Sequence, residues 1–91
     1  MARLLFTVVD RFDIEGRGVV AVPGLAAADA ALRPGTLLEI RRSDAPARRT
    51  RLAGLELLNP SPKDRIVPIM FPLDITKADL PIGAEVWSVD S

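Results

Sequence analysis

The sequence contains no cysteine, no histidine and no tyrosine. Without cysteine the chain can form neither a disulfide framework nor a thiolate metal site, and without histidine it lacks the commonest metal ligand and general base. Acid–base catalysis would then need a carboxylate pair in a cleft, such as Asp10 with Asp13 or Asp74 with Asp79. We therefore expect no enzyme activity, no catalytic residue, no metal and no cofactor.

An excess of either charge is also missing. Twelve basic and twelve acidic residues cancel, and the sequence pI is near 6.2, whereas dedicated nucleic-acid-binding domains usually have a pI above about 9. Aromatic residues are scarce as well, with three Phe and one Trp, so no run of aromatics offers a platform on which bases could stack. Any contact with RNA must therefore be local.

Long hydrophobic runs are absent. The apolar run 4–9 near the start is about half the length of a usual signal-peptide core, and no small-residue cleavage site follows it. No window approaches the roughly 20 apolar residues of a membrane-spanning helix. We expect no membrane segment and a cytoplasmic location.

The chain has 91 residues, of which 48% are hydrophobic and 26% are charged, which is typical of one soluble globular domain over residues 1–91. Short β-branched or alternating segments between Gly, Pro, Asn and Asp clusters predict strands. The turns include Arg11–Glu15 and Pro23-Gly24, and Leu25–Leu32 is interpreted as a loop with one helical turn. Six strands are predicted, over Arg3–Asp10, Val19–Val22, Thr36–Arg42, Arg48–Asn59 with a bend at Gly54, Arg65–Phe71 and Ala84–Val89.

This pattern, with no β–α–β alternation, predicts an all-β fold, either an antiparallel barrel or a sandwich. A closed barrel is favoured because closure removes the exposed edges of a small sheet. Gly16 and Gly18 are expected to supply the corner at which the first two strands meet. Pro68 indicates an edge, a bulge or a break in strand pairing.

Three blocks of the sequence carry a resemblance to a known family. Residues 9–18, Val-Asp-Arg-Phe-Asp-Ile-Glu-Gly-Arg-Gly, resemble the opening of the second domain of elongation factor Tu, the β-barrel shared by translational GTPases. Residues 33–40 are similar to a strand of that domain, and residues 79–86 to its closing turn and strand. The resemblance implies a six-stranded closed antiparallel Greek-key barrel over almost the whole chain.

The same resemblance implies candidate binding residues. In elongation factor Tu this barrel helps to hold the aminoacylated 3′ end of transfer RNA, and Asp10, Phe12 and Arg17 occupy matching positions. No Gly-x-x-x-x-Gly-Lys-Ser/Thr phosphate loop is present, so no nucleotide is expected to bind and the GTPase domain is missing. From the residues alone, Arg17 is interpreted either as a surface ion-pair partner of nearby carboxylates or as a ligand for a phosphate or carboxylate.

A second cluster of candidates is basic. If the strands on either side of a turn at Asp44–Ala47 pair, several guanidinium groups gather at one hairpin tip. The alternatives are a solvated hairpin or a site for phosphate or an acidic partner. Trp87 is interpreted as a core residue or a lid on a barrel end, with a partner-facing aromatic as the alternative. The arginines concerned are Arg41, Arg42, Arg48, Arg49 and Arg51.

Two functional hypotheses follow. The preferred one is a stand-alone, translation-factor-like binding module that docks a protein partner or a second copy of itself. The alternative is RNA binding, to a transfer RNA 3′ end or ribosomal RNA, through Asp10, Phe12, Arg17 and the arginines of the hairpin; such binding should weaken steeply as salt rises.

Overall fold

The computed structural model describes residues 2–25, 32–55 and 67–89, and within these ranges the chain is all-β apart from one short 3₁₀ helix, η2. The strands are short because Gly, Pro and Asp interrupt the apolar segments every few residues. The elements are β1 (Arg3–Thr7), β2 (Asp10–Ile14), β3 (Gly18–Leu25), β4 (Leu37–Arg41), β5 (Arg48–Arg51), β6 (Gly54–Leu55), β7 (Val67–Met70), η2 (Lys77–Asp79) and β8 (Glu85–Ser88).

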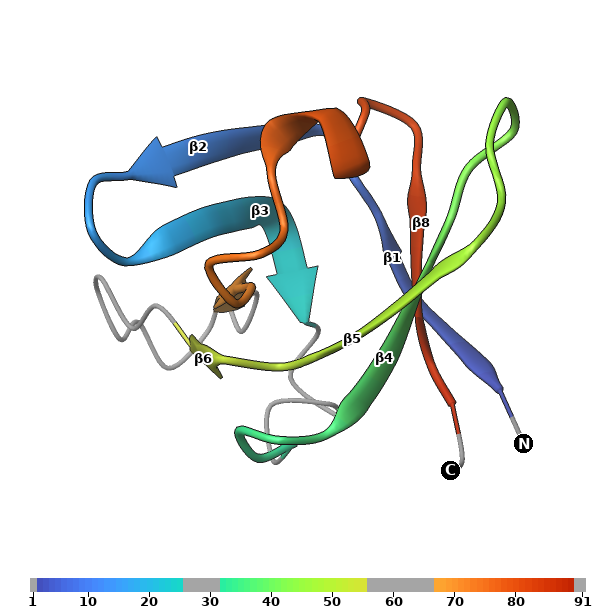
Figure 1. Ribbon diagram of the computed structural model, residues 1–91. Coiled ribbons are helices and arrows are strands. Elements are labelled where there is room, and N and C mark those ends of the chain that lie inside the picture. Colours follow the sequence, from blue (N-terminus) through green and yellow to red (C-terminus); the bar gives the residue numbers. More distant parts are fainter. Residues whose placement is uncertain (1, 26–31, 56–66, 90–91) are drawn as a thin grey trace.

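The strands form two antiparallel sheets (Figure 1). One has the order β1-β8-β4-β5 and the other the order β2-β3-β7-β6. The prediction of an all-β antiparallel fold is confirmed. The predictions of six strands and of a closed barrel are not confirmed. The described residues form eight strands, which pair as two separate four-stranded sheets.

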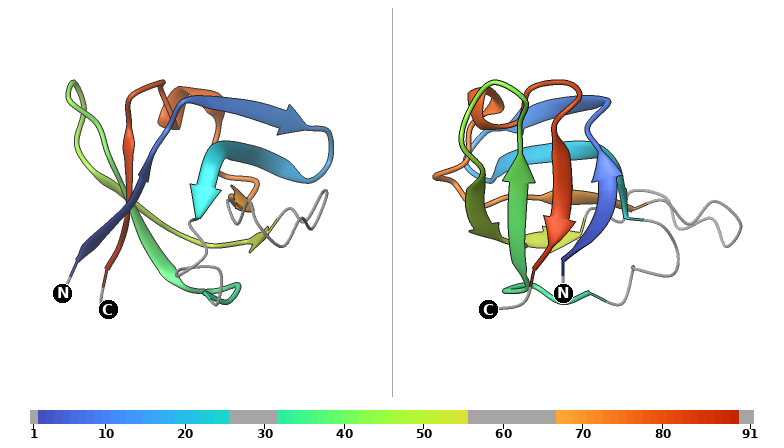
Figure 2. Two further views of the ribbon diagram at one scale, coloured as in Figure 1. Left: turned by 180° about the vertical axis from the view of Figure 1, so that it is seen from behind. Right: turned by 90° about the vertical axis from the view of Figure 1, so that its right-hand side faces the viewer.

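Along the described strands the chain crosses between the sheets four times, and at two of these crossings, β1 to β2 and β5 to β6, it bends at a corner of only two residues. Figure 2 shows the molecule from two further sides. At the first corner, the Val8 N–H donates to Ala84 beside β8 and the next N–H, that of Val9, donates to Val22 of β3. At the second corner, the Leu52 N–H donates to Thr36 beside β4 and the Ala53 N–H donates to Met70 of β7. At each corner the N–H groups of two successive residues therefore bond to opposite sheets, as expected where a strand bends between two packed layers.

The core lies between the sheets, and in β4 it follows the period-2 alternation of a strand. In β4, Leu38 and Ile40 lie on the same face and are fully buried, and Val86 of β8 joins them from the neighbouring strand. Trp87 lies opposite Glu39 and so points to the outer face, which corrects its interpretation as a core residue. The buried cluster is Leu5, Phe6, Val8, Val19, Ala21, Leu25, Leu38, Ile40, Leu52, Ile69, Phe71, Ile75, Leu80, Ala84 and Val86.

The expected turn Arg11–Glu15 is mostly strand, and this moves the predicted corner. Residues of β2 pair in register with β3, from Asp10 opposite Val22 to Ile14 opposite Gly18. Gly16, with φ of 76°, therefore lies in a hairpin turn rather than at the junction between sheets. The segment was predicted as a turn because Asp10, Arg11 and Asp13 are charged, and its two apolar residues, Phe12 and Ile14, are too few to indicate a strand by alternation alone.

The dipeptide Pro23-Gly24 does not end its strand. The register of β3 against β7 shifts between Ala21 and Leu25, so the dipeptide forms an irregularity within β3, and Leu25 is fully buried beyond it. Pro68 lies in β7 opposite this shift, which matches the bulge alternative. The predicted bend of the fourth strand occurs at residues 52–53 rather than at Gly54.

Two predictions lie wholly or mostly outside the described residues: the helical turn within Leu25–Leu32 and the loop over residues 59–64. Where the structure is described, no helix is long and apolar enough to cross a membrane.

Candidate functional site at the arginine hairpin

The predicted basic hairpin is present. Strands β4 and β5 pair in register, with Leu37 opposite Arg51 and Ile40 opposite Arg48. The tip projects beyond the sheet at the upper right of Figure 1. Pairing therefore places Arg41 and Arg42 on one arm and Arg48 on the other, as the sequence predicts.

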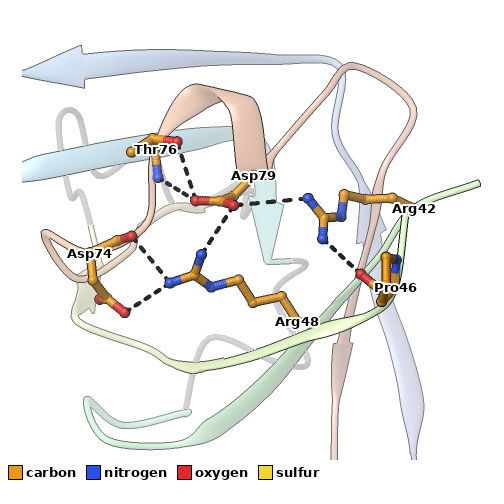
Figure 3. A network of polar contacts seen from close by, with 6 residues as sticks. All are labelled: Arg42, Pro46, Arg48, Asp74, Thr76 and Asp79. Carbon is orange, nitrogen blue, oxygen red and sulfur yellow. Dashed lines mark hydrogen bonds and ion pairs between the residues drawn. The ribbon is translucent and has the colours of Figure 1, made fainter. Parts of the chain in front are cut away.

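Two arginines of the hairpin hold the segment that leads to β8 (Figure 3). The Arg48 guanidinium lies 3.2 Å from a carboxylate oxygen of Asp79 and 3.2 Å from one of Asp74, and it also donates to the Asp74 carbonyl oxygen. Arg42 donates to the Pro46 carbonyl oxygen at 2.7 Å and lies 3.8 Å from Asp79. These contacts fasten the hairpin to the connection between β7 and β8.

Asp79 is the centre of this network. Its second carboxylate oxygen accepts hydrogen bonds from the backbone N–H and the hydroxyl of Thr76, at 2.9 and 3.2 Å, which closes the first turn of η2. The Thr76 N–H bond, followed by the charges of Arg48 and Arg42, holds the pKa of Asp79 below its ordinary value of 3.8. Asp79 is thus a carboxylate at neutral pH and does not serve as a proton donor with Asp74.

A second cluster lies on the outer face of the β1-β8-β4-β5 sheet. The Glu39 carboxylate pairs with Arg41 at 2.7 Å and with Arg49 at 3.3 Å, and the Arg41 hydrogen bond is the main cause of a lowered pKa for Glu39. The Arg41 guanidinium also lies 4.1 Å from the ring centre of Trp87, within the range of a cation–π contact. The Trp87 Nε1–H donates to Glu85.

All five arginines predicted at this hairpin have partners within the chain. Four of them make the contacts described above, and the fifth, Arg51, donates a hydrogen bond to the Gly35 carbonyl oxygen. The other four pair with three carboxylates, those of Glu39, Asp74 and Asp79. The sequence did not show these partners because Asp74 and Asp79 are far from the hairpin along the chain.

The other three predicted site residues lie elsewhere. Asp10, Phe12 and Arg17 belong to the β2–β3 hairpin of the second sheet, whose turn lies at the left of Figure 1, on the opposite side from the tip of the arginine hairpin. Phe12 is 51% exposed, and the Asp10 carboxylate accepts the N–H of Arg11. The turn that carries Arg17 is therefore separate from the arginine hairpin, whereas Asp10 directly follows the first corner.

A pocket of about 270 Å³ lies where the arginine hairpin meets the start of β8. Arg41 and Glu85 face each other across the β4–β8 pairing and line it together with Arg42, Ser43 and Gly83. The Nε of Arg42 is buried and has no hydrogen-bond partner. Buried polar groups in folded proteins nearly always have one, so this guanidinium has donor capacity to spare.

An apolar surface adjoins this pocket, and sequence reasoning missed it. The Gly83 N–H donates to the Val8 carbonyl oxygen at 2.8 Å, which brings Ile82 and Val9 to the same corner of the molecule. Their side chains are 63% and 64% exposed. We call this pair the Val9–Ile82 corner. The two residues are far apart in the sequence, and the hydrogen bond that brings them together is visible only in three dimensions.

Other kinds of site are not found within the described ranges: no group of three or more acidic side chains there could hold a metal ion. No family model, no curated protein and no solved structure matches this chain. The function is therefore inferred from the geometry of the hairpin, the pocket and the Val9–Ile82 corner.

Proposed function

We propose that this protein is a non-catalytic binding module that docks another protein, or a second copy of itself, through the end of the molecule that carries the Val9–Ile82 corner. The observation that supports this proposal is the exposure of two large aliphatic side chains at one corner of the molecule. When a partner removes apolar surface of this kind from water, the complex is stabilised by roughly 25 cal/mol per Å² of surface buried. The translation-factor likeness and the cytoplasmic location are part of this proposal.

The internal pairing of the arginines favours docking of protein over RNA. Nucleic-acid binding relies on Lys and Arg that neutralise phosphates and release counterions. Here Arg48 and Arg41 are engaged with carboxylates of the same chain, so binding a phosphate would break existing ion pairs. The turn of the β2–β3 hairpin also lies on the opposite side of the molecule from the tip of the arginine hairpin (Figure 1).

The test compares two exposed side chains from the connection between β7 and β8. Ile82 belongs to the corner, whereas Leu73 does not and is 70% exposed. We expect Ile82→Ser to abolish association, either self-association in sedimentation equilibrium or capture of a partner at 150 mM salt, and Leu73→Ser to leave it intact. A chain that stays monomeric and captures no partner, or equal losses in both variants, would contradict the proposal.

The same samples test the RNA alternative. Association that requires nucleic acid, is removed by nuclease and weakens by orders of magnitude between 50 and 200 mM salt would overturn protein docking. Association that is insensitive to nuclease and weakens only modestly over the same salt range is expected.

A further inference from the structure

We propose that the pocket lined by Arg41, Arg42, Ser43, Gly83 and Glu85 receives a carboxylate from an acidic peptide segment of the partner protein, while the Val9–Ile82 corner takes an adjacent apolar side chain. This inference rests on the proposed docking function and names the chemistry of the partner. It combines the pocket, the spare donor capacity of Arg42 and the apolar corner, which lie next to one another.

The continuity of the two surfaces comes from Gly83. This residue lines the pocket, its N–H is bonded to Val8, and its neighbour Ile82 is one half of the apolar corner. Consecutive residues of an extended peptide are about 3.3 Å apart, so one residue can occupy the corner while the next or next but one reaches the pocket. The partner segment is therefore expected to contain an aliphatic residue close to Asp or Glu.

The charge preference comes from Arg42. A guanidinium has five N–H donors, and the contacts of Arg42 are one bond to the Pro46 carbonyl oxygen and an ion pair with Asp79 at 3.8 Å. Asp79 is engaged more closely by Arg48, at 3.2 Å. A carboxylate in the pocket would supply acceptors to the least engaged guanidinium of the network, and charge-assisted bonds of this kind are the stronger ones.

Glu85 determines which class of anion the pocket favours. Its carboxylate also lines the pocket and is held by the Trp87 Nε1–H at 3.0 Å. A fixed negative charge opposes a phosphate dianion more than a carboxylate monoanion. The neighbouring corner is aliphatic and contains no aromatic ring for a nucleobase to stack on, which favours a peptide.

Nuclear magnetic resonance of the 91-residue chain tests this inference with defined probes. The probe is acetyl-Gly-Leu-Asp-Gly-amide, and its controls replace Asp by Asn, or Leu by Gly. We expect the Asp peptide to shift the amide signals of Ser43 and Gly83 and the Nε–H signal of Arg42 saturably, and the Asn peptide to bind at least about tenfold more weakly. The peptide without Leu should also bind more weakly. Equal binding of the Asp and Asn peptides, no shift at these groups, or tighter binding of inorganic phosphate would overturn the proposal.

Three variants locate the effect. Glu85→Gln removes the opposing charge while keeping an acceptor for Trp87, so it should tighten the Asp peptide about threefold or more. Arg42→Gln should weaken binding of the Asp peptide about tenfold. Arg49→Gln, on the same hairpin with a side chain 60% exposed and outside the pocket, should leave this binding unchanged.

Unchanged binding in Glu85→Gln would contradict the proposal even if Arg42→Gln failed to fold. If the peptides do not bind but Ile82→Ser still abolishes association, the docking function stands and the carboxylate site is rejected.

Discussion

The two corners at which the chain bends directly from one sheet into the other have the same construction but expose different surfaces. Each has a buried apolar residue, Val8 or Leu52, whose N–H bonds within one sheet, followed by a residue whose N–H bonds to the other sheet. At the second corner that following residue is Ala53, a single methyl group. At the first corner it is Val9, next to Ile82.

The comparison separates what the fold needs from what it does not. Both corners need a buried apolar residue to join the layers, since the core continues through that position. Neither needs a large apolar side chain at the outward position, as Ala53 demonstrates. The exposed valine and isoleucine at the first corner are therefore not explained by the architecture, and this is the physical reason for assigning that corner to binding.

The largest effect is expected where β3 receives the bond from the first corner. Gly24 lies two residues after Val22, has φ of 106°, and a Cβ at this position would collide with the Val67 carbonyl oxygen. Gly24→Ala should lower the free energy of unfolding by more than about 4 kcal/mol, because the β3–β7 pairing must open to admit the methyl group. Urea unfolding followed by circular dichroism measures this loss.

The control for that variant is Gly35→Ala. Gly35 also has a positive φ, of 95°, but a methyl group added there would meet no other atom within 4 Å. The only cost is the strain of holding an alanine at a positive φ, so Gly35→Ala should lower the free energy of unfolding by about 1 kcal/mol. Equal losses at the two glycines would show that the contact with Val67 does not restrict β3.

The inner residues of the two corners should be alike in their importance for stability. Leu52 and Val8 both belong to the buried cluster. Leu52→Ala should cost about 3 kcal/mol, and Val8→Ala, which removes fewer atoms, about 2 kcal/mol. Thermal and urea unfolding measure both. If either substitution cost less than about 0.5 kcal/mol, that corner would not be part of the continuous core, and the comparison would lose its basis.

The sequence predicted those features that depend on local periodicity. The alternation in Thr36–Arg42 indicated the strand β4, with Leu38 and Ile40 directed inward, and the same pattern put Val86 and Trp87 on opposite faces of β8. The hairpin that gathers the arginines followed from the turn residues between two such segments. These elements pair with neighbours whose signals are equally local.

Features that depend on distant partners could not be predicted. Strand β2 has only two apolar residues among three charged ones, and its pairing with β3 holds it in the strand conformation. The first corner was expected at Gly16 and Gly18, but the chain bends at Val8–Val9, whose N–H groups donate to the carbonyl oxygens of residues 84 and 22. For the candidate site, the arginines were predicted but not the carboxylates at residues 74 and 79 that neutralise them.

Acid should affect the first corner more than the second, because the ion pairs of Asp79 hold the connection that carries Ile82. The pKa of Asp79 in the folded protein is below 3.8 and that of Glu39 is below 4.5, so the unfolded chain takes up protons first as the pH falls. The stability that these groups provide is complete above those ordinary values and is lost as the pH falls through the lower folded values. Stability should be flat above about pH 5 and should decline below pH 4.5.

Asp79→Asn tests the origin of that decline. The variant should lose about 1 kcal/mol at pH 7, where the ion pairs with Arg48 and Arg42 are intact, and should show a shallower acid decline than the original chain. Urea titrations at a series of pH values measure both quantities. A decline of unchanged steepness would assign the acid sensitivity to other carboxylates and would leave the first corner independent of this network.

The smallest effect on stability should accompany the clearest effect on binding. Val9→Ser removes an exposed aliphatic side chain from the first corner, and Ala53→Ser makes the matching outward position of the second corner polar. Neither position belongs to the buried cluster, so the free energy of unfolding of each variant should lie within about 0.5 kcal/mol of that of the original chain.

Because the valine is expected to lie in the docked interface, Val9→Ser should weaken association measured by sedimentation or capture about tenfold, whereas Ala53→Ser should not change it. Loss of association in both variants would mean that binding depends on the general integrity of the corners, and loss in neither would remove the first corner from the interface and leave the valine without a physical explanation.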